Sequence, residues 1–262
     1  MDPLASGITR LKVADVELEL FHKGAGRPLL ILHGGGGLDH RSEYLDLLAA
    51  HFEVFAPSHP GFGHSPLPER FESVDDLAYL YLDLLDACDL KDAVLIGFSL
   101  GGWIAAELAV RCAHRLSKLV LVGAVGIKVS DRETRDIPDI FATAPDDVAR
   151  LVFHDPARAA VDFGALTDEE LTIIARNRES LALYTWEPYM HNPGLRYQLH
   201  RIHIPTLFIR GASDGLISQK YAEAYAALIP GARLEVIAEA GHLPQIEQPR
   251  KFADRVVSFA RQ

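Results

Sequence analysis

The chain has 262 residues, a formal net charge of −10 and a pI near 5.6, with 48% hydrophobic and 24% charged residues. This composition is typical of a globular domain, and the charge argues against a nucleic-acid-binding surface, which needs a clustered basic face. No stretch approaches the roughly 18 consecutive apolar residues of a membrane span, and the first residues lack a signal-peptide pattern. We therefore expect a cytoplasmic protein that binds neither nucleic acid nor membrane, built as one domain with an insertion.

The first elements predict the edge and the centre of a sheet. Residues 8–21 alternate apolar and polar side chains around a turn at Ala14-Asp15, which is typical of an antiparallel edge hairpin. A continuous apolar run begins at Leu29 and predicts a strand buried on both faces. Four glycines, 34–37, follow it and leave backbone N–H groups free to approach a ligand. No Gly-Lys-Ser/Thr follows them and the dinucleotide-binding glycine pattern is not met, so neither nucleotide motif is predicted.

Residues 93–106, AVLIGFSLGGWIAA, predict a strand, a sharp turn and a helix, with Ser99 at the apex of the turn. Such a turn strains its apex residue and closes only if the residues two before and two after it lack bulk. Gly97 and Gly101 meet this requirement. A serine hydroxyl is a weak nucleophile, so Ser99 indicates chemistry only if a base and an orienting acid reach it.

The rest of the chain alternates strands and helices around one long interruption. Segments 53–65, 73–90 and 116–126 predict a strand with a Pro/Gly-rich loop, a helix and a strand, and 204–211 and 232–238 predict two more strands. This alternation predicts an α/β fold with a mostly parallel sheet flanked by helices. Residues 128–199 show no strong strand pattern and several prolines. We interpret them as a helical cap inserted into a core made of 1–127 and 200–262.

Two further residues fall just after predicted strands. Asp214 follows the strand at 204–211 and His242 follows the strand at 232–238, so the chain order is Ser99, Asp214, His242. The chain resembles the α/β-hydrolase family over nearly its whole length, and that resemblance implies an eight-stranded sheet. The motifs that carry it are His33-Gly34-Gly35-Gly36, Pro60-Gly61-Phe62-Gly63-His64-Ser65, Gly97-Phe98-Ser99-Leu100-Gly101-Gly102, Gly211-Ala212-Ser213-Asp214 and Gly241-His242.

The resemblance implies a role for each matching residue. Ser99 would attack an acyl carbonyl, His242 would accept and return the proton, and Asp214 would orient the imidazole. The backbone N–H groups of Gly35 and Leu100 would bind the oxyanion. Residues expected to contact the substrate are Gly34, Phe98, Trp186 and Leu243.

The many histidines are not predicted to bind metal. His33 is expected to hydrogen-bond the backbone of its loop. No metal-ligand spacing occurs among His40, His51, His59 and His64. We expect no metal, no cofactor and a small-molecule substrate, and a homo-oligomer is left open.

A serine at the apex indicates acyl transfer to water, because the epoxide hydrolases and haloalkane dehalogenases that this fold resembles need an aspartate there. We expect a small to medium, partly apolar ester or lactone. The main alternative is hydrolysis of carbon–carbon bonds in ring-cleavage dienoates. Enzymes of that kind usually carry Asn before the serine and Trp after the histidine, where this chain has Phe98 and Leu243. A small-molecule receptor with little turnover is a third hypothesis.

The cap is expected to cover Ser99 and select the acyl group, with Trp186 as a wall of the pocket. Most of the other large cap side chains are expected to form the core of the cap, with one or two reaching the pocket. These side chains are Phe153, Tyr184, Tyr189 and Met190.

Overall fold

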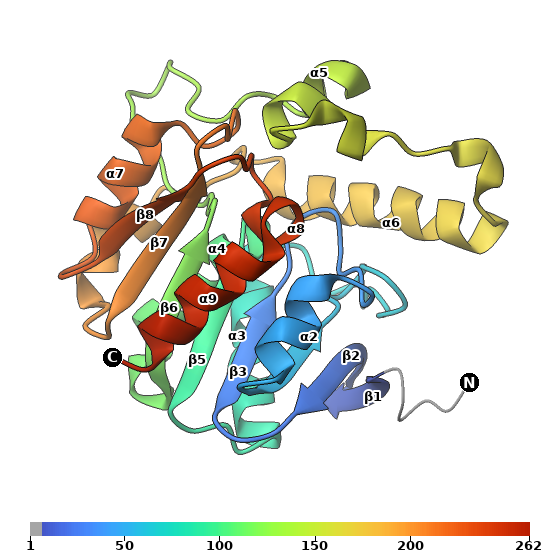
Figure 1. Cartoon of the computed structure of the whole chain (residues 1–262). Helices are drawn as coiled ribbons and strands as arrows, with labels where there is room; N and C mark the ends of the chain where they lie inside the picture. Colours follow the sequence, from blue (N-terminus) through green and yellow to red (C-terminus); the bar gives the residue numbers. More distant parts are fainter. Residues whose placement is uncertain (1–6) are drawn as a thin grey trace.

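The computed structural model describes residues 7–262, which form an eight-stranded sheet with helices on both faces (Figure 1). The sheet order is β1-β2-β4-β3-β5-β6-β7-β8. The strands are β1 (Ile8–Val13), β2 (Val16–Gly24), β3 (Pro28–Leu32), β4 (Glu53–Pro57), β5 (Ala93–Phe98), β6 (Leu116–Val122), β7 (Thr206–Gly211) and β8 (Arg233–Ile237). From β4 to β8 in this order every pair is parallel, which confirms the predicted sheet.

The edge of the sheet is the predicted hairpin. β1 and β2 pair antiparallel, with Val13 opposite Val16, and β2 pairs antiparallel with β4. Ala14 in the turn has a φ of 51°, the left-handed conformation of a tight hairpin turn. Beyond this hairpin the carboxyl ends of the parallel strands meet at one end of the sheet, where α/β folds bind ligands.

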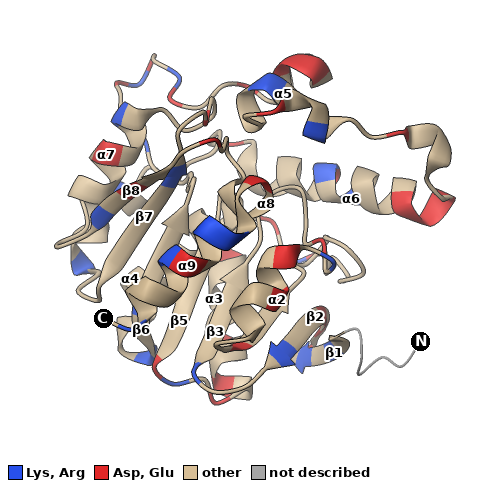
Figure 2. Cartoon of the chain, viewed as in Figure 1, with Lys and Arg blue, Asp and Glu red and all other residues tan. Residues whose placement is uncertain are grey.

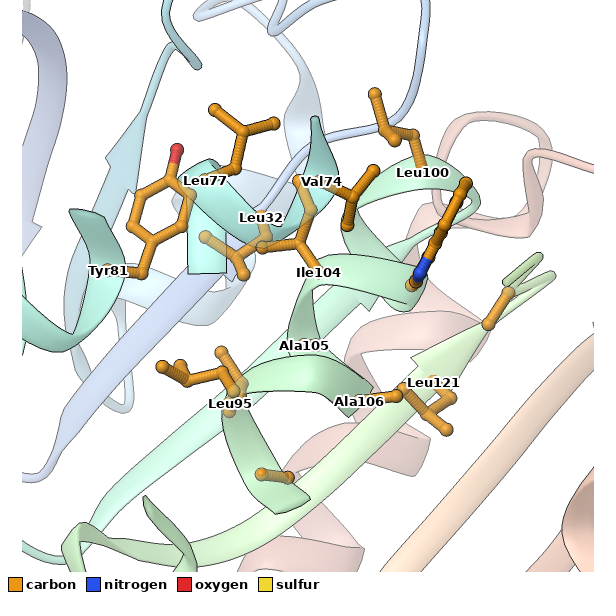
Figure 3. Close-up of a cluster of buried hydrophobic side chains, with 14 of the residues drawn as sticks. Leu32, Val74, Leu77, Tyr81, Leu95, Leu100, Ile104, Ala105, Ala106 and Leu121 are labelled. Atoms are coloured by element: carbon orange, nitrogen blue, oxygen red, sulfur yellow. The ribbon is translucent and has the colours of Figure 1, made fainter. Parts of the chain in front are cut away.

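Alternate side chains of the central strands pack on opposite faces of the sheet. Leu95 of β5 lies in the core formed with α3 (Val74–Ala87), α4 (Leu100–Cys112) and α7 (Gln219–Ala227). Its neighbours Val94 and Ile96 lie in the core formed with α2 (Glu43–Ala49) and α9 (Pro249–Ala260). Figure 3 shows the first of these cores around Leu95. β3 and β5 carry no charged residue (Figure 2), in agreement with their burial on both faces.

The chain between β6 and β7 forms the predicted helical segment. It contains α5 (Pro145–Val152) and α6 (Asp168–Thr185) with short 3-10 turns. Among its described residues β structure is limited to one bridge, between Gly126 and His191. In Figure 1 α5 and α6 lie beyond one end of the sheet. None of the helices within residues 7–262 is both long and apolar enough to cross a membrane.

A buried carboxylate lies on β2 beneath the loop that follows β4. Glu19 is 6% exposed, accepts a hydrogen bond from Ser58 Oγ at 2.8 Å, and lies 3.3 Å from His40 Nε2. The backbone N–H of His64 donates to the same carboxylate at 3.3 Å. Burial raises the pKa of Glu19, but the contacts with His40, Ser58 and His64 outweigh it and lower the pKa to about 2.

This lowered pKa predicts a pH-dependent contribution to stability. The ionised Glu19 stabilises the fold fully above its ordinary pKa of 4.5, and this contribution is lost as the pH falls toward 2. At pH 7 we expect Glu19→Gln to lower the free energy of unfolding by on the order of 2 kcal/mol, because the amide keeps an acceptor oxygen but loses the negative charge that strengthens these buried contacts. Urea unfolding at pH 7 and pH 3 should show the difference from wild type narrowing at pH 3.

Glu17→Gln is the matched control, since Glu17 is exposed on the same strand. It should unfold like wild type at both pH values. A Glu19→Gln difference that stays constant from pH 7 to pH 3 would show that ionisation of this carboxyl does not stabilise the fold.

Candidate active site

Ser99 stands at the sharp turn between β5 and α4. Its φ of 49° and ψ of −109° are a strained conformation for a residue with a side chain. A Cβ at Gly97 would lie 2.2 Å from the carbonyl oxygen of Gly101, and a Cβ at Gly101 would lie 2.0 Å from that of Leu32. Both glycines are therefore required for the turn to close, as the sequence predicted. The turn exposes Ser99 at the carboxyl end of a central strand.

The loops after β7 and β8 bring Asp214 and His242 together. His242 Nδ1 lies 2.9 Å from Asp214 Oδ2, and the two residues are 6% and 4% exposed. The other carboxylate oxygen, Oδ1, accepts hydrogen bonds from the backbone N–H groups of Leu216 and Ile217, both at 2.9 Å. With an ionised Asp214 the imidazole proton lies on Nδ1, which leaves Nε2 as a proton acceptor. Nε2 is buried and has no hydrogen-bond partner among residues 7–262.

The end of α5 is tied to both of these loops. The carbonyl oxygen of Val152 accepts from the N–H of His242 at 2.6 Å, and that of Leu151 accepts from the N–H of Gly215 at 2.8 Å. The buried carboxylate of Glu247 accepts from the N–H groups of Gly241 at 2.6 Å and His154 at 3.0 Å. This end of the cap is thus part of the scaffold of the His242 loop. Sequence reasoning missed Glu247, which stands between Ile246 and Gln248 and carries no distinguishing signal in the sequence.

The glycine loop after β3 is held by two stacked histidines. His33 Nε2 accepts from the N–H of His59 at 2.9 Å, so its proton lies on Nδ1, which donates to the carbonyl oxygen of Gly34 at 2.7 Å. Burial lowers the pKa of His33 to about 4, so the ring is neutral at pH 7. The prediction that His33 bonds loop backbone is confirmed. Because the carbonyl and N–H of one peptide point in opposite directions, this bond also sets the direction of the Gly35 N–H.

Helix α6 closes over this loop. Asn177 donates to the carbonyl oxygen of Gly36 at 2.9 Å and accepts from the N–H of Gly63 at 2.9 Å. A Cβ at Gly35 would lie 2.6 Å from both methyl groups of Leu181. These contacts fix α6 above the glycine loop, and a side chain at position 35 would have to displace the Leu181 methyl groups.

Ser99 and His242 line one cavity of about 380 Å³, within the range of small-molecule sites. The polar side chains that line it are those of Ser99, His242, His33, Asp39, Ser42, Tyr44 and Gln245. Its apolar lining includes Val125, Ile137, Ile140, Val152, Leu181, Met190, Leu216 and Ile246. Of the predicted site residues, Gly34, Gly35, Phe98, Leu100 and Leu243 also line it.

The structure does not place Trp186 in this cavity. Its side chain is 56% exposed, and its ring packs edge-on against Phe141 at 5.7 Å. Trp186 follows the last residue of α6, and α6 turns a different face, the one with Leu181, toward the glycine loop. Met190 does reach the cavity, in agreement with the expectation that one or two of the large cap residues would.

A larger hollow of about 730 Å³ is lined mainly by residues 127–137 and 187–197. It contains neither Ser99 nor His242. Ile137 and Met190 line both the hollow and the cavity.

Residues 29–255 match the Alpha/beta hydrolase family, so the chain belongs to this family. It is 30% identical to a 2-hydroxymuconate semialdehyde hydrolase of Pseudomonas sp. (strain CF600), over 94% of this chain and 91% of that one. It is 32% identical to a pimeloyl-[acyl-carrier protein] methyl ester esterase of Aromatoleum aromaticum, over 89% of this chain and 98% of that one. The crystal structure of a meta-cleavage product hydrolase superposes with a TM-score of 0.80 at 23% identity, covering 98% of this chain and 99% of that one. The two sequence relatives support a hydrolase and divide between ester and carbon–carbon cleavage, and the solved structure supports the fold.

Proposed function

We propose that the chain is a serine hydrolase that cleaves uncharged esters or lactones through an acyl-enzyme. The observation that carries the proposal is the shared cavity, which is lined both by Ser99 at its strained turn and by a histidine whose Nδ1 is held by Asp214. In this proposal Ser99 is the nucleophile, His242 is the base and Asp214 is the orienting acid.

The chemistry follows from the positions of these groups. Ser99 Oγ attacks the acyl carbonyl and gives its proton to His242 Nε2, the nitrogen without a partner among the described residues. The negative oxygen that forms is bound by the N–H groups of Gly35 and Leu100. The first N–H groups of a helix lack intrahelical acceptors, so that of Leu100, at the start of α4, is free to donate. His242 then protonates the leaving alcohol, and water hydrolyses the acyl-enzyme by the same steps.

The lining of the cavity favours an uncharged ester over a dienoate. A ring-cleavage dienoate carries a carboxylate, whose burial is costly unless a cation or several donors pair with it. None of the described residues that line the cavity is Lys or Arg, and the Asp39 carboxylate is paired with Arg41 Nε at 3.2 Å. Carbon–carbon cleavage remains the second candidate because of the 2-hydroxymuconate semialdehyde hydrolase relative.

A matched substrate panel tests this function. Butyl butyrate and monobutyl succinate share their alcohol and have acyl groups of similar length, but the succinate carries a carboxylate. We expect kcat/KM to be about 10- to 100-fold higher for the butyrate, because the cavity offers the anion no cation. A 2-hydroxy-6-oxo-dienoate should turn over more slowly than the butyrate.

Faster cleavage of the dienoate than of either ester would identify carbon–carbon hydrolysis as the activity. Binding that raises Tm without any turnover would instead indicate a receptor. The panel therefore separates the three hypotheses in one set of measurements.

A further inference from the structure

A buried amide in the wall of the cavity has an unpaired oxygen. Gln245 lies in α8 (Pro244–Glu247), is 5% exposed and lines the cavity. Its Oε1 is buried and has no hydrogen-bond partner among the described residues. Buried polar atoms are nearly always hydrogen-bonded, and an unpaired acceptor on a side chain that lines a cavity can be satisfied by a donor of a bound ligand.

Other polar side chains of the cavity come from the neighbouring helix. α2 contacts α8, and Ser42 and Tyr44 at the start of α2 line the same cavity. The Ser42 side chain makes no capping hydrogen bond to α2. Burial, helped by the charge of Asp39, raises the pKa of Tyr44, so its hydroxyl stays protonated. This group of residues contrasts with the apolar remainder of the lining.

The chemistry of this group selects the kind of ligand. A carboxamide oxygen accepts hydrogen bonds, so its partner must carry an O–H or N–H. The hydroxyls of Ser42 and Tyr44 can both donate and accept, and a ligand hydroxyl suits them equally. None of the described lining residues is Lys or Arg, so an anion would find no cation here.

We propose that Gln245, with Ser42 and Tyr44, forms a subsite for a hydroxyl group on the alcohol part of the substrate. This inference rests on the proposed function, because it assigns one end of the same ester. His242 must protonate the leaving alcohol, and Gln245 follows His242 by three residues on the turn into α8. The side of the cavity next to His242 is therefore the side of the alcohol. Gln245 determines specificity and takes no part in the bond-breaking steps.

Two isosteric esters test the subsite: butyl butyrate and 3-hydroxypropyl butyrate, in which a hydroxyl replaces the last methyl group. Wild type should prefer the hydroxylated ester. Gln245→Met keeps the volume but removes the acceptor, and should lower kcat/KM for 3-hydroxypropyl butyrate about tenfold while changing that for butyl butyrate less than about threefold. Gln245→Glu keeps an acceptor and should retain the preference.

Gln219→Met is the matched control, because Gln219 is exposed on α7, outside the cavity, and this variant should behave as wild type with both esters. Each protein is also assayed with methyl propionate, whose alcohol part is too short to reach the subsite. Wild type that hydrolyses none of the three would overturn the proposed function itself. Wild type that hydrolyses them, with Gln245→Met slowing both butyrates equally, would overturn the subsite alone. A third ester, ethyl 6-hydroxyhexanoate, carries its hydroxyl on the acyl part. If Gln245→Met lowered kcat/KM for this ester alone, the subsite would bind the acyl part and the assignment to the alcohol would be wrong.

Discussion

Replacing Ser99 with alanine is expected to lower kcat for ester hydrolysis about 10⁴- to 10⁶-fold, because no acyl-enzyme can form without the hydroxyl. Wild type should take up one fluorophosphonate group per chain, and Ser99→Ala should take up none. Intact-protein mass spectrometry measures the label, and initial rates with butyl butyrate measure the activity. The alanine removes one oxygen and keeps the Cβ, so the strained turn and its two glycines are unchanged.

Ser258→Ala provides the matched control, since Ser258 is exposed on α9, away from the cavity. It should keep both the label and the activity of wild type. Labelling that persists in Ser99→Ala at an unchanged rate would remove Ser99 from the mechanism. Loss of activity together with a large fall in Tm would require Ser99→Cys, which keeps a nucleophilic atom in place and should still react with an alkylating probe.

The sequence predicted those features that follow from local pattern. Apolar runs such as that at 93–98 are buried on both faces of a parallel sheet, and the strand ends place Ser99, Asp214 and His242 at one end of it. The turn at Ser99 was predictable because only glycine fits at Gly97 and Gly101. These features depend on short-range sterics and on the order of the strands, and both can be read from the sequence.

The lining of the cavity was not predictable in the same way. Which side of α6 faces the glycine loop depends on how the cap docks, and that docking is set by long-range polar contacts. Asn177 bonds Gly36 and Gly63, and Glu247 bonds the segment after α5, across sequence separations that no periodicity reveals. A large aromatic residue such as Trp186 therefore looked like a pocket wall, whereas the wall is the smaller Leu181.

Both oxygens of Asp214 have partners, and this makes Asp214→Asn a sharp test of its role. Oδ1 accepts from two backbone N–H groups, so an asparagine must keep its carbonyl oxygen there and turn its NH₂ group toward His242. The NH₂ group can only donate, so His242 Nδ1 must become the acceptor and the imidazole proton moves to Nε2. In that tautomer Nε2 cannot take the proton of Ser99.

We therefore expect Asp214→Asn to lower kcat about 10⁴-fold with little change in fold, as is typical when the orienting acid of such a triad becomes an amide. Initial rates with butyl butyrate and Tm measure the two quantities. Asp254→Asn, an exposed substitution on α9, should leave both as in wild type. If Asp214→Asn kept more than about a tenth of wild-type kcat, the wrong tautomer would not be limiting, and a different group would have to orient His242. The expected loss falls on kcat more than on KM, because the tautomer of His242 affects proton transfer in the transition state and leaves the apolar cavity that binds the ester intact.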